Sequence, residues 1–136
     1  MRTGVVVVSH GESGMAMVQT AEKMVGSLGA SIVTVPVGES RDTTKIHIEA
    51  ACDALGCEET LFLVDLEGST PFNLCSKRHG HTVVLTGVNL PMLFKLATVD
   101  RERHAAELAQ ELAATGQKSI HICTGPDHDR NDDRES

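Results

Sequence analysis

His10 and Asp65 are the residues of this chain whose types and positions best fit chemistry. His10 follows an apolar run, residues 4–9, and Asp65 ends another, residues 60–65. Because parallel strands bring their carboxyl ends to one edge of a sheet, we expect the two side chains to meet there. A carboxylate that holds one imidazole nitrogen as a donor leaves the other nitrogen with a free lone pair. The pair therefore predicts a nucleophile or a general base.

Small and hydroxyl-bearing residues follow both positions. Gly11 and Gly14 allow backbone amides to approach an anion, and the predicted helix after them directs its positive end to the same place. Thr70, followed by a proline, is a typical helix start, with its hydroxyl as the expected cap. An imidazole between two helix starts fits phosphate chemistry.

Each of these features also has a purely structural interpretation. A histidine at a strand end is often a hydrogen-bonded loop residue, and Asp65 can cap the helix that follows it. The Gly-Glu-Ser-Gly run, residues 11–14, can be a simple entry turn to a helix. We favour a functional site because all three features coincide at one predicted crevice.

The elements that must position this site follow an alternating pattern. Short β-branched runs predict strands, and amphipathic stretches between them predict helices. The first helix is expected to stop at Gly29, and Asp42 is expected to cap the second. The predicted strands are 4–9, 31–36, 60–65, 82–86 and 119–123, and the helices lie after them in the order βαβαβαβααβ. This order predicts an α/β fold with an open, doubly wound, mostly parallel sheet of order 2-1-3-4 and helices on both faces. The half-polar last run is expected to be an edge strand.

Composition limits the possible functions. Residues 1–123 suit a single domain, and the tail, residues 124–136, carries five acids and two arginines and is expected to be disordered. The net charge of −7 and the absence of Trp and Tyr argue against nucleic-acid binding. We recognise no signal peptide or membrane-spanning run and expect a cytoplasmic protein. The four cysteines have no C-x-x-C spacing and are expected to be small buried thiols, so neither a metal nor a cofactor is predicted.

A second histidine motif is less informative. Arg78-His79-Gly80 spells the "RHG" of the phosphoglycerate mutase and acid phosphatase families, but it precedes its strand and is expected at the opposite edge of the sheet. Ser9 stands where those families need an arginine before the catalytic histidine, so we do not favour that chemistry. The remaining histidines are expected on the surface, namely His47, His81, His104, His121 and His128.

Three motifs together resemble a known family. "VVVVSHGESGMA", "LFLVDLEGSTPFN" and "GVNLPML" are similar to segments of the enzyme IIA component of the mannose-type (mannose/fructose/sorbose) bacterial phosphoenolpyruvate:sugar phosphotransferase system, and the similarity covers about residues 2–123. The resemblance implies that His10 takes a phosphoryl group from the carrier protein HPr and passes it to an enzyme IIB. It implies that Asp65 orients His10 and that Thr70 matches a serine hydroxyl near the phosphate.

The resemblance also concerns assembly and partners. It implies a homodimer, for which exchange of the last strand, near 119–123, is one arrangement. Membrane components IIC and IID would take part indirectly in sugar uptake. The family segment often has an aromatic residue and a second glycine where this chain has Glu67 and Ser69. Ser69 adds a hydroxyl, and we count it with Gly11 and Thr70 as a candidate phosphate contact. Two alternatives stay open: a regulatory module whose binding depends on phosphorylation of His10, and the phosphoryl-donor subunit of a dihydroxyacetone kinase.

Overall fold

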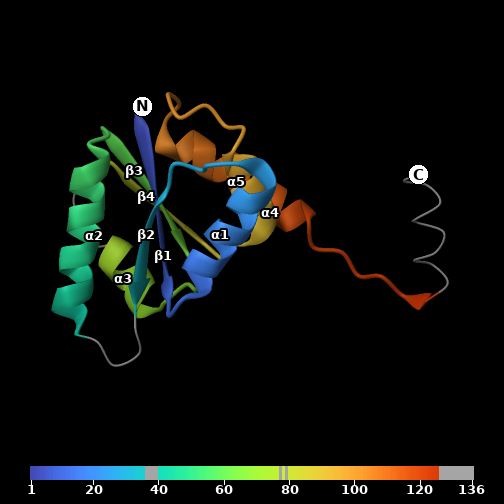
Figure 1. Cartoon of the computed structure of the whole chain (residues 1–136), viewed down its shortest axis with the longest axis horizontal. Coiled ribbons are helices and arrows are strands. Elements are labelled where there is room, and N and C mark those ends of the chain that lie inside the picture. The colour runs from blue at the N-terminus through green and yellow to red at the C-terminus, as the bar shows by residue number, and fades with distance from the viewer. Residues whose placement is uncertain (36–39, 77, 79, 126–136) are drawn as a thin grey trace.

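The computed structural model describes residues 1–35, 40–76, 78 and 80–125 of the chain. Figure 1 shows a central sheet between two layers of helices. Within the described residues the sheet holds four parallel strands in the order β2-β1-β3-β4. The strands are β1 (Thr3–His10), β2 (Ser31–Val35), β3 (Glu59–Val64) and β4 (Thr82–Thr86). The α/β class is confirmed, and the order of the strands is the one predicted.

The register of the sheet brings the two predicted site residues to one edge. β1 lies between β2 and β3, with His10 opposite Val35 on one side and Val8 opposite Val64 on the other. Val64 is the last residue of β3, so Asp65 follows where β1 also ends. The carboxyl ends of the central strands therefore deliver both side chains to the place where the strand order reverses.

Helices cover both faces of the sheet, as predicted. Figure 1 shows α1, α4 and α5 on one side and α2 and α3 on the other. Their bounds are α1 (Ser13–Val25), α2 (Arg41–Leu55), α3 (Thr70–Ser76), α4 (Leu90–Leu96) and α5 (Ala105–Lys118). Among the helices that the structure describes, none combines the length and the apolar character needed to cross a bilayer.

Four consecutive valines make β1 the centre of the fold. Val5 and Val7 belong to the core cluster with α1, α4 and α5, whereas Val6 and Val8 belong to the cluster with α2 and α3. All four side chains are fully buried. Burial of each is worth about 1.5–3 kcal/mol, so β1 is fixed from both faces. A continuous apolar run is typical of such a doubly covered strand.

Two helix boundaries differ from the sequence predictions. α1 ends at Val25, before the predicted Gly29, because Gly26 takes a φ of +88° that ends the helix. The cap of α2 is Ser40 and not Asp42: the Ser40 Oγ accepts a hydrogen bond from the Thr43 N–H at 3.2 Å. Asp42 lies instead in the first turn, where a carboxylate is favoured by the helix dipole.

The prediction of a strand at 119–123 is wrong for the single chain. After α5 the described chain extends away from the body of the molecule (Figure 1), and Ile120 and Ile122 are 76% and 92% exposed. Alternation of polar and apolar residues indicates a half-buried strand, but a strand also needs a neighbour with which to pair. No described strand of this chain pairs with the segment, and β4 pairs only with β3. The predicted disordered tail lies outside the described residues from position 126 onward.

Candidate functional site

His10 and Asp65 form a closely bonded pair at the carboxyl edge of the sheet. The Nδ1 atom of His10 lies 2.9 Å from the Oδ2 atom of Asp65. The backbone N–H of His10 donates to the same Oδ2 atom at 2.8 Å. A carboxylate oxygen only accepts, so Nδ1 carries a proton, and in the neutral ring Nε2 keeps the lone pair. The His10 side chain is 43% exposed and that of Asp65 is 20% exposed, so the imidazole is the accessible member of the pair.

The second oxygen of Asp65 has a different environment. Asp65 Oδ1 is buried and has no hydrogen-bond partner among the described residues. Both donors to this carboxylate come from His10. Asp65 therefore orients one histidine and does not cap the helix that follows it, which was its structural interpretation.

The turn after His10 is compact. Gly11 has a φ of +54°, a left-handed conformation that side chains other than glycine rarely adopt. The Ser13 hydroxyl donates to the His10 carbonyl oxygen at 3.0 Å, which closes the turn before α1. The backbone at position 11 therefore favours glycine for a specific reason.

The loop after Asp65 is organised by Ser69 and not by Thr70. The Ser69 hydroxyl accepts from the Phe72 N–H at 3.3 Å and donates to the Leu66 carbonyl oxygen at 2.6 Å. Ser69 is therefore the cap of α3, and Thr70 is its first residue, so the prediction that the Thr70 hydroxyl caps the helix is wrong. The half-buried Thr70 hydroxyl makes no hydrogen bond within the described part of the chain. It is available for a ligand, whereas the one Ser69 proton is already donated.

The rim around His10 is acidic and partly apolar. Glu12 and Glu67, each two residues beyond a member of the pair, are both exposed. Met15 and Leu66 are 37% and 61% exposed although they are large and apolar. A rim of this kind combines negative charge with exposed apolar surface.

The other histidine motif lies elsewhere. Arg78 pairs with Glu49 at 3.2 Å, just before β4 begins and at the opposite edge from His10, as predicted. His79 lies outside the described residues. The described residues of the "RHG" motif, Arg78 and Gly80, therefore lie away from the His10 edge of the sheet.

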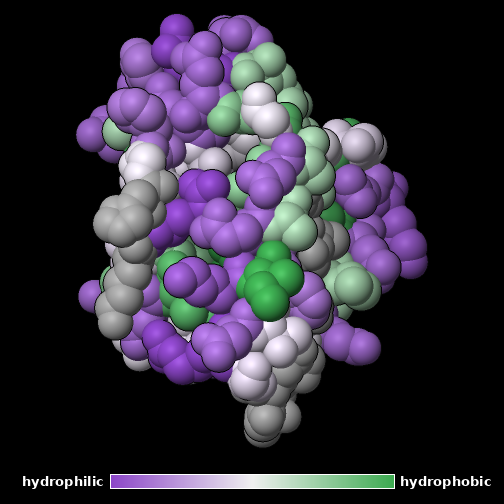
Figure 2. Space-filling model, turned by 90° about the vertical axis from the view of Figure 1, so that its left-hand side faces the viewer, coloured by the Kyte–Doolittle hydropathy of each residue, from purple (hydrophilic) through white to green (hydrophobic). Residues whose placement is uncertain are grey.

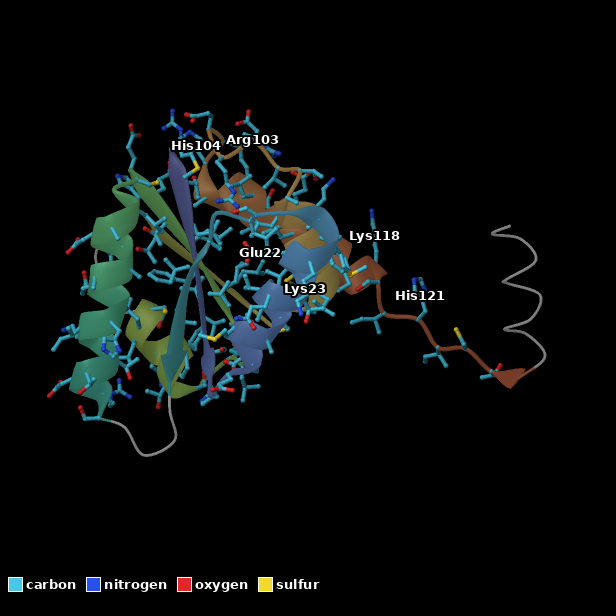
Figure 3. All side chains as sticks on the ribbon, in the orientation of Figure 1. Glu22, Lys23, Arg103, His104, Lys118 and His121 are labelled. Atoms are coloured by element: carbon cyan, nitrogen blue, oxygen red, sulfur yellow. The ribbon has the colours of Figure 1, made fainter. Side chains whose placement is uncertain are left out.

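Sequence reasoning missed a second histidine–carboxylate pair. His104, expected to be a plain surface residue, places Nδ1 2.7 Å from the Glu59 Oε2 atom. Figure 3 shows His104 beside Arg103 near the start of β1, at the opposite edge from the end of that strand. The Ala105 N–H bonds the other oxygen, Glu59 Oε1, at 3.0 Å. That backbone bond, followed by the bond to His104, lowers the pKa of Glu59.

The cysteines lie in different environments. Cys52 and Cys75 are buried thiols, and burial raises the pKa of Cys75 to about 12. Cys57 is half-buried and Cys123 is exposed, so the expectation of buried thiols holds for two of the four.

Figure 2 shows the α2 side of the molecule as mostly hydrophilic. A hollow of ≈250 Å³ between α2 and α3 is lined by Arg41, Asp42, Lys45, Ile48, Glu49, Leu74 and Arg78, and it is separate from the His10–Asp65 pair.

Comparison with known proteins gives a consistent result. Residues 4–114 match the model of the EIIA-man family, described as PTS system fructose IIA component. The chain is 26% identical over 122 residues to the PTS system sorbose-specific EIIA component of Klebsiella pneumoniae, covering 88% of this chain and 90% of that protein. It is 29% identical over 126 residues to the PTS system mannose-specific EIIAB component of Escherichia coli (strain K12), covering 88% of this chain but 39% of that longer protein.

A solved structure agrees with the sequence matches. The mannose/sorbose specific IIA subunit of the phosphotransferase system from Enterococcus faecalis superposes with a TM-score of 0.83 at 28% identity. The match covers 93% of this chain and 98% of that structure. The matched proteins differ in the sugar that their names carry, so the shared feature is the type of component and not the sugar.

Proposed function

The chain belongs to the EIIA-man family of phosphotransferase-system components, and we propose that it relays a phosphoryl group through His10 during sugar uptake. The observation that carries this proposal is the 2.9 Å contact between His10 Nδ1 and Asp65 Oδ2. That contact holds the proton on Nδ1 and leaves Nε2 as the nucleophile. We therefore propose Nε2 of His10 as the phosphorylated atom.

The chemical step is a transfer between two nitrogen atoms. The Nε2 lone pair of His10 attacks phosphorus in line and forms a new N–P bond. The N–P bond of the donor phosphohistidine breaks, and its electron pair stays on the donor nitrogen. The His10 ring becomes a phosphorylated imidazolium whose positive charge is balanced by the Asp65 carboxylate. Because the transition state is loose, positioning and electrostatics account for most of the catalysis.

Of the three candidate residues, two are proposed to contact the phosphoryl oxygens and one to hold the loop beside them. The Gly11 backbone N–H and the Thr70 hydroxyl are proposed as direct donors. The hydroxyl of Thr70 is supported in this role because it makes no hydrogen bond within the described residues. Ser69 is better suited to hold the loop, because a direct bond from its hydroxyl would replace the bond to the Leu66 carbonyl.

The proposed partners are proteins. HPr would supply the phosphoryl group, and an enzyme IIB would receive it, with the membrane components IIC and IID acting downstream. The name of the Escherichia coli relative combines A and B in one protein, which supports an IIB as the next acceptor. The acidic and apolar rim formed by Glu12, Met15, Leu66 and Glu67 supports a basic protein donor. We place this relay in the cytoplasm.

We also propose that the protein acts as a homodimer. The exposed isoleucines of the segment 119–123 support an arrangement in which this segment pairs with the sheet of a second copy, because β4 is an edge strand in the described chain. Pairing there would cover both isoleucines and the open side of β4.

The test is labelling by the complete phosphoryl chain. The protein is incubated with radioactive phosphoenolpyruvate, enzyme I and HPr. We expect an acid-labile, alkali-stable label that disappears in His10→Ala and persists in His104→Ala, the matched control. An unlabelled wild-type protein, or equal labelling of His10→Ala, contradicts the proposal.

Onward transfer separates the relay from its alternatives. Passage of the label to a cognate enzyme IIB supports the sugar-uptake role. Phosphorylation-dependent binding of a partner without onward transfer would support a regulatory module. Transfer to a dihydroxyacetone kinase subunit would support the third function.

A further inference from the structure

Ser9 is a buried polar residue directly before the proposed phosphoryl acceptor. Its exposed fraction is 0%, in a strand whose other interior residues are mostly valines. Because side chains alternate along a strand, Ser9 lies on the same face as Val5 and Val7, beneath α1. The Ser9 Oγ atom accepts a hydrogen bond from the Gly14 N–H at 2.8 Å. This bond joins the end of β1 to the first turn of α1.

The bond replaces a cap that α1 otherwise lacks. Glu12 occupies the cap position, but its φ of −97° and ψ of 8° are not the extended conformation typical of caps. The Glu12 side chain makes no capping hydrogen bond. The Ser9 hydroxyl therefore satisfies one of the free N–H groups at the start of α1 from five residues upstream.

Gly14 is the residue that allows this close approach. A Cβ atom at position 14 would overlap the Ser9 Oγ atom, and it would lie 3.0 Å from the Val7 Cγ1 atom. Any side chain at this position would separate the start of α1 from β1. The hydroxyl at position 9 and the glycine at position 14 thus form one contact, and neither residue makes it without the other.

We infer that Ser9 is a positioning residue for phosphoryl transfer at His10. The segment between Ser9 and Gly14 carries His10, and it is fastened at both ends: Asp65 holds the histidine, and the Ser9–Gly14 bond holds the helix that follows. Ser9 does not contact the phosphoryl group. It acts by keeping the His10–Ser13 turn and the α1 amides in a fixed relation to the imidazole. This inference rests on the proposed function of His10.

Thr3 offers a matched control within the same strand. Its side chain is also 0% exposed, and its hydroxyl donates to the Arg103 carbonyl oxygen at 2.8 Å. Thr3 is at the start of β1, at the opposite edge of the sheet from His10. A merely structural role for buried hydroxyls predicts similar effects at the two positions, whereas a positioning role predicts an effect on transfer only at Ser9.

The experiment compares Ser9→Ala and Thr3→Val with the wild type at temperatures where all are folded by circular dichroism. We expect the maximal rate of His10 phosphorylation to fall about tenfold in Ser9→Ala, with the KM for phosphorylated HPr unchanged. Thr3→Val should label at the wild-type rate. Ser9→Thr, which keeps an acceptor oxygen, should recover most of the rate. Ser9→Cys, which lacks the hydroxyl oxygen, takes the place of Ser9→Ala if the alanine variant does not fold.

A second measurement needs no phosphoryl donor. Proton–nitrogen correlation spectra of the His10 ring should show a single tautomer, protonated at Nδ1, in the wild type and in Thr3→Val, and a mixture in Ser9→Ala. Equal rates and equal ring spectra for Ser9→Ala and Thr3→Val overturn the inference about Ser9 while leaving the relay intact. A wild-type protein that takes no label overturns the relay, and the ring spectra then decide whether Ser9 positions His10.

Discussion

The molecule carries the same side-chain pairing at both edges of its sheet, and the two pairs differ in what the carboxylate does. At the carboxyl edge, Asp65 Oδ2 accepts from both the backbone and the ring of His10. At the opposite edge, Glu59 divides its oxygens between the His104 ring and the Ala105 N–H. Glu59 also lies 3.9 Å from the Arg2 guanidinium. Glu59 therefore stabilises the start of α5, whereas Asp65 bonds only to His10 among the described residues.

A hydrogen bond between a histidine and a carboxylate therefore does not by itself indicate a reactive site. His104 is more exposed than His10, at 60% against 43%, and its ring makes the shorter contact. What distinguishes His10, the proposed acceptor, is its place at the reversal of strand order and before a turn that needs a positive φ. Thr70, after Asp65, also has a hydroxyl without a hydrogen bond among the described residues. The place of each pair in the fold therefore distinguishes the two histidines better than the distance between imidazole and carboxylate does.

Removal of the carboxylate charge should affect phosphorylation strongly at Asp65 and not at Glu59. Asp65→Asn should slow phosphorylation of His10 about a hundredfold, because the amide neither fixes the ring tautomer nor balances the imidazolium. Glu59→Gln should leave that rate unchanged. Initial labelling rates with saturating phosphorylated HPr measure both variants. Equal slowing by the two substitutions would show that the edges are not functionally distinct.

A smaller effect separates the two hydroxyls near Asp65. Thr70→Val should slow labelling on the order of tenfold, because a hydrogen bond to a charged oxygen is lost, with the melting temperature unchanged. Ser69→Ala should destabilise the fold by about 1 kcal/mol, because Phe72 loses its cap, with a weaker effect on the rate. Denaturant titration and labelling rates test the pair together. A slower Ser69→Ala than Thr70→Val would assign the phosphate contact to Ser69.

The smallest effect concerns the pH dependence of stability at the His104 edge. The pKa of Glu59 is lowered from 4.5 in the folded chain, so its ionised form stabilises the fold at higher pH. That contribution is complete above the unfolded pKa and is lost as the pH falls through the lowered folded value. Wild type should therefore lose more stability than Glu59→Gln between neutral pH and acid below pH 4.5, as measured by denaturation midpoints. Parallel pH curves for the two proteins would contradict this prediction.

The sequence was sufficient for the features that depend on long patterns. The valine run of β1 predicted a strand covered on both faces, and the alternation of elements predicted the order that brings His10 to Asp65. These inferences succeed because the apolar faces of the strands and helices must be buried and because connections between parallel strands are right-handed. Together the two constraints allow few arrangements of the strands. The convergence of the two side chains follows from topology alone.

Features decided by single residues were predicted less well. Capping fell to Ser40 and Ser69, each one or two residues before the residue expected, because a cap depends on the local backbone angles and not only on residue type. The pair of Glu59 and His104 joins positions far apart in sequence, and no local pattern marks it. The alternation at 119–123 says what kind of surface the segment suits, but it does not say where the neighbouring strand comes from.

The Oδ2 atom of Asp65 orders the His10 side chain before any partner binds. Oδ2 accepts hydrogen bonds from both the main-chain nitrogen and the ring nitrogen of His10. These two bonds together restrict the side-chain torsions of His10. The entropic cost of ordering the imidazole therefore arises when the chain folds. In the proposed relay it would not reduce the affinity for a phosphoryl donor. A phosphoryl donor in that relay would therefore meet an imidazole that is already held in place by Asp65.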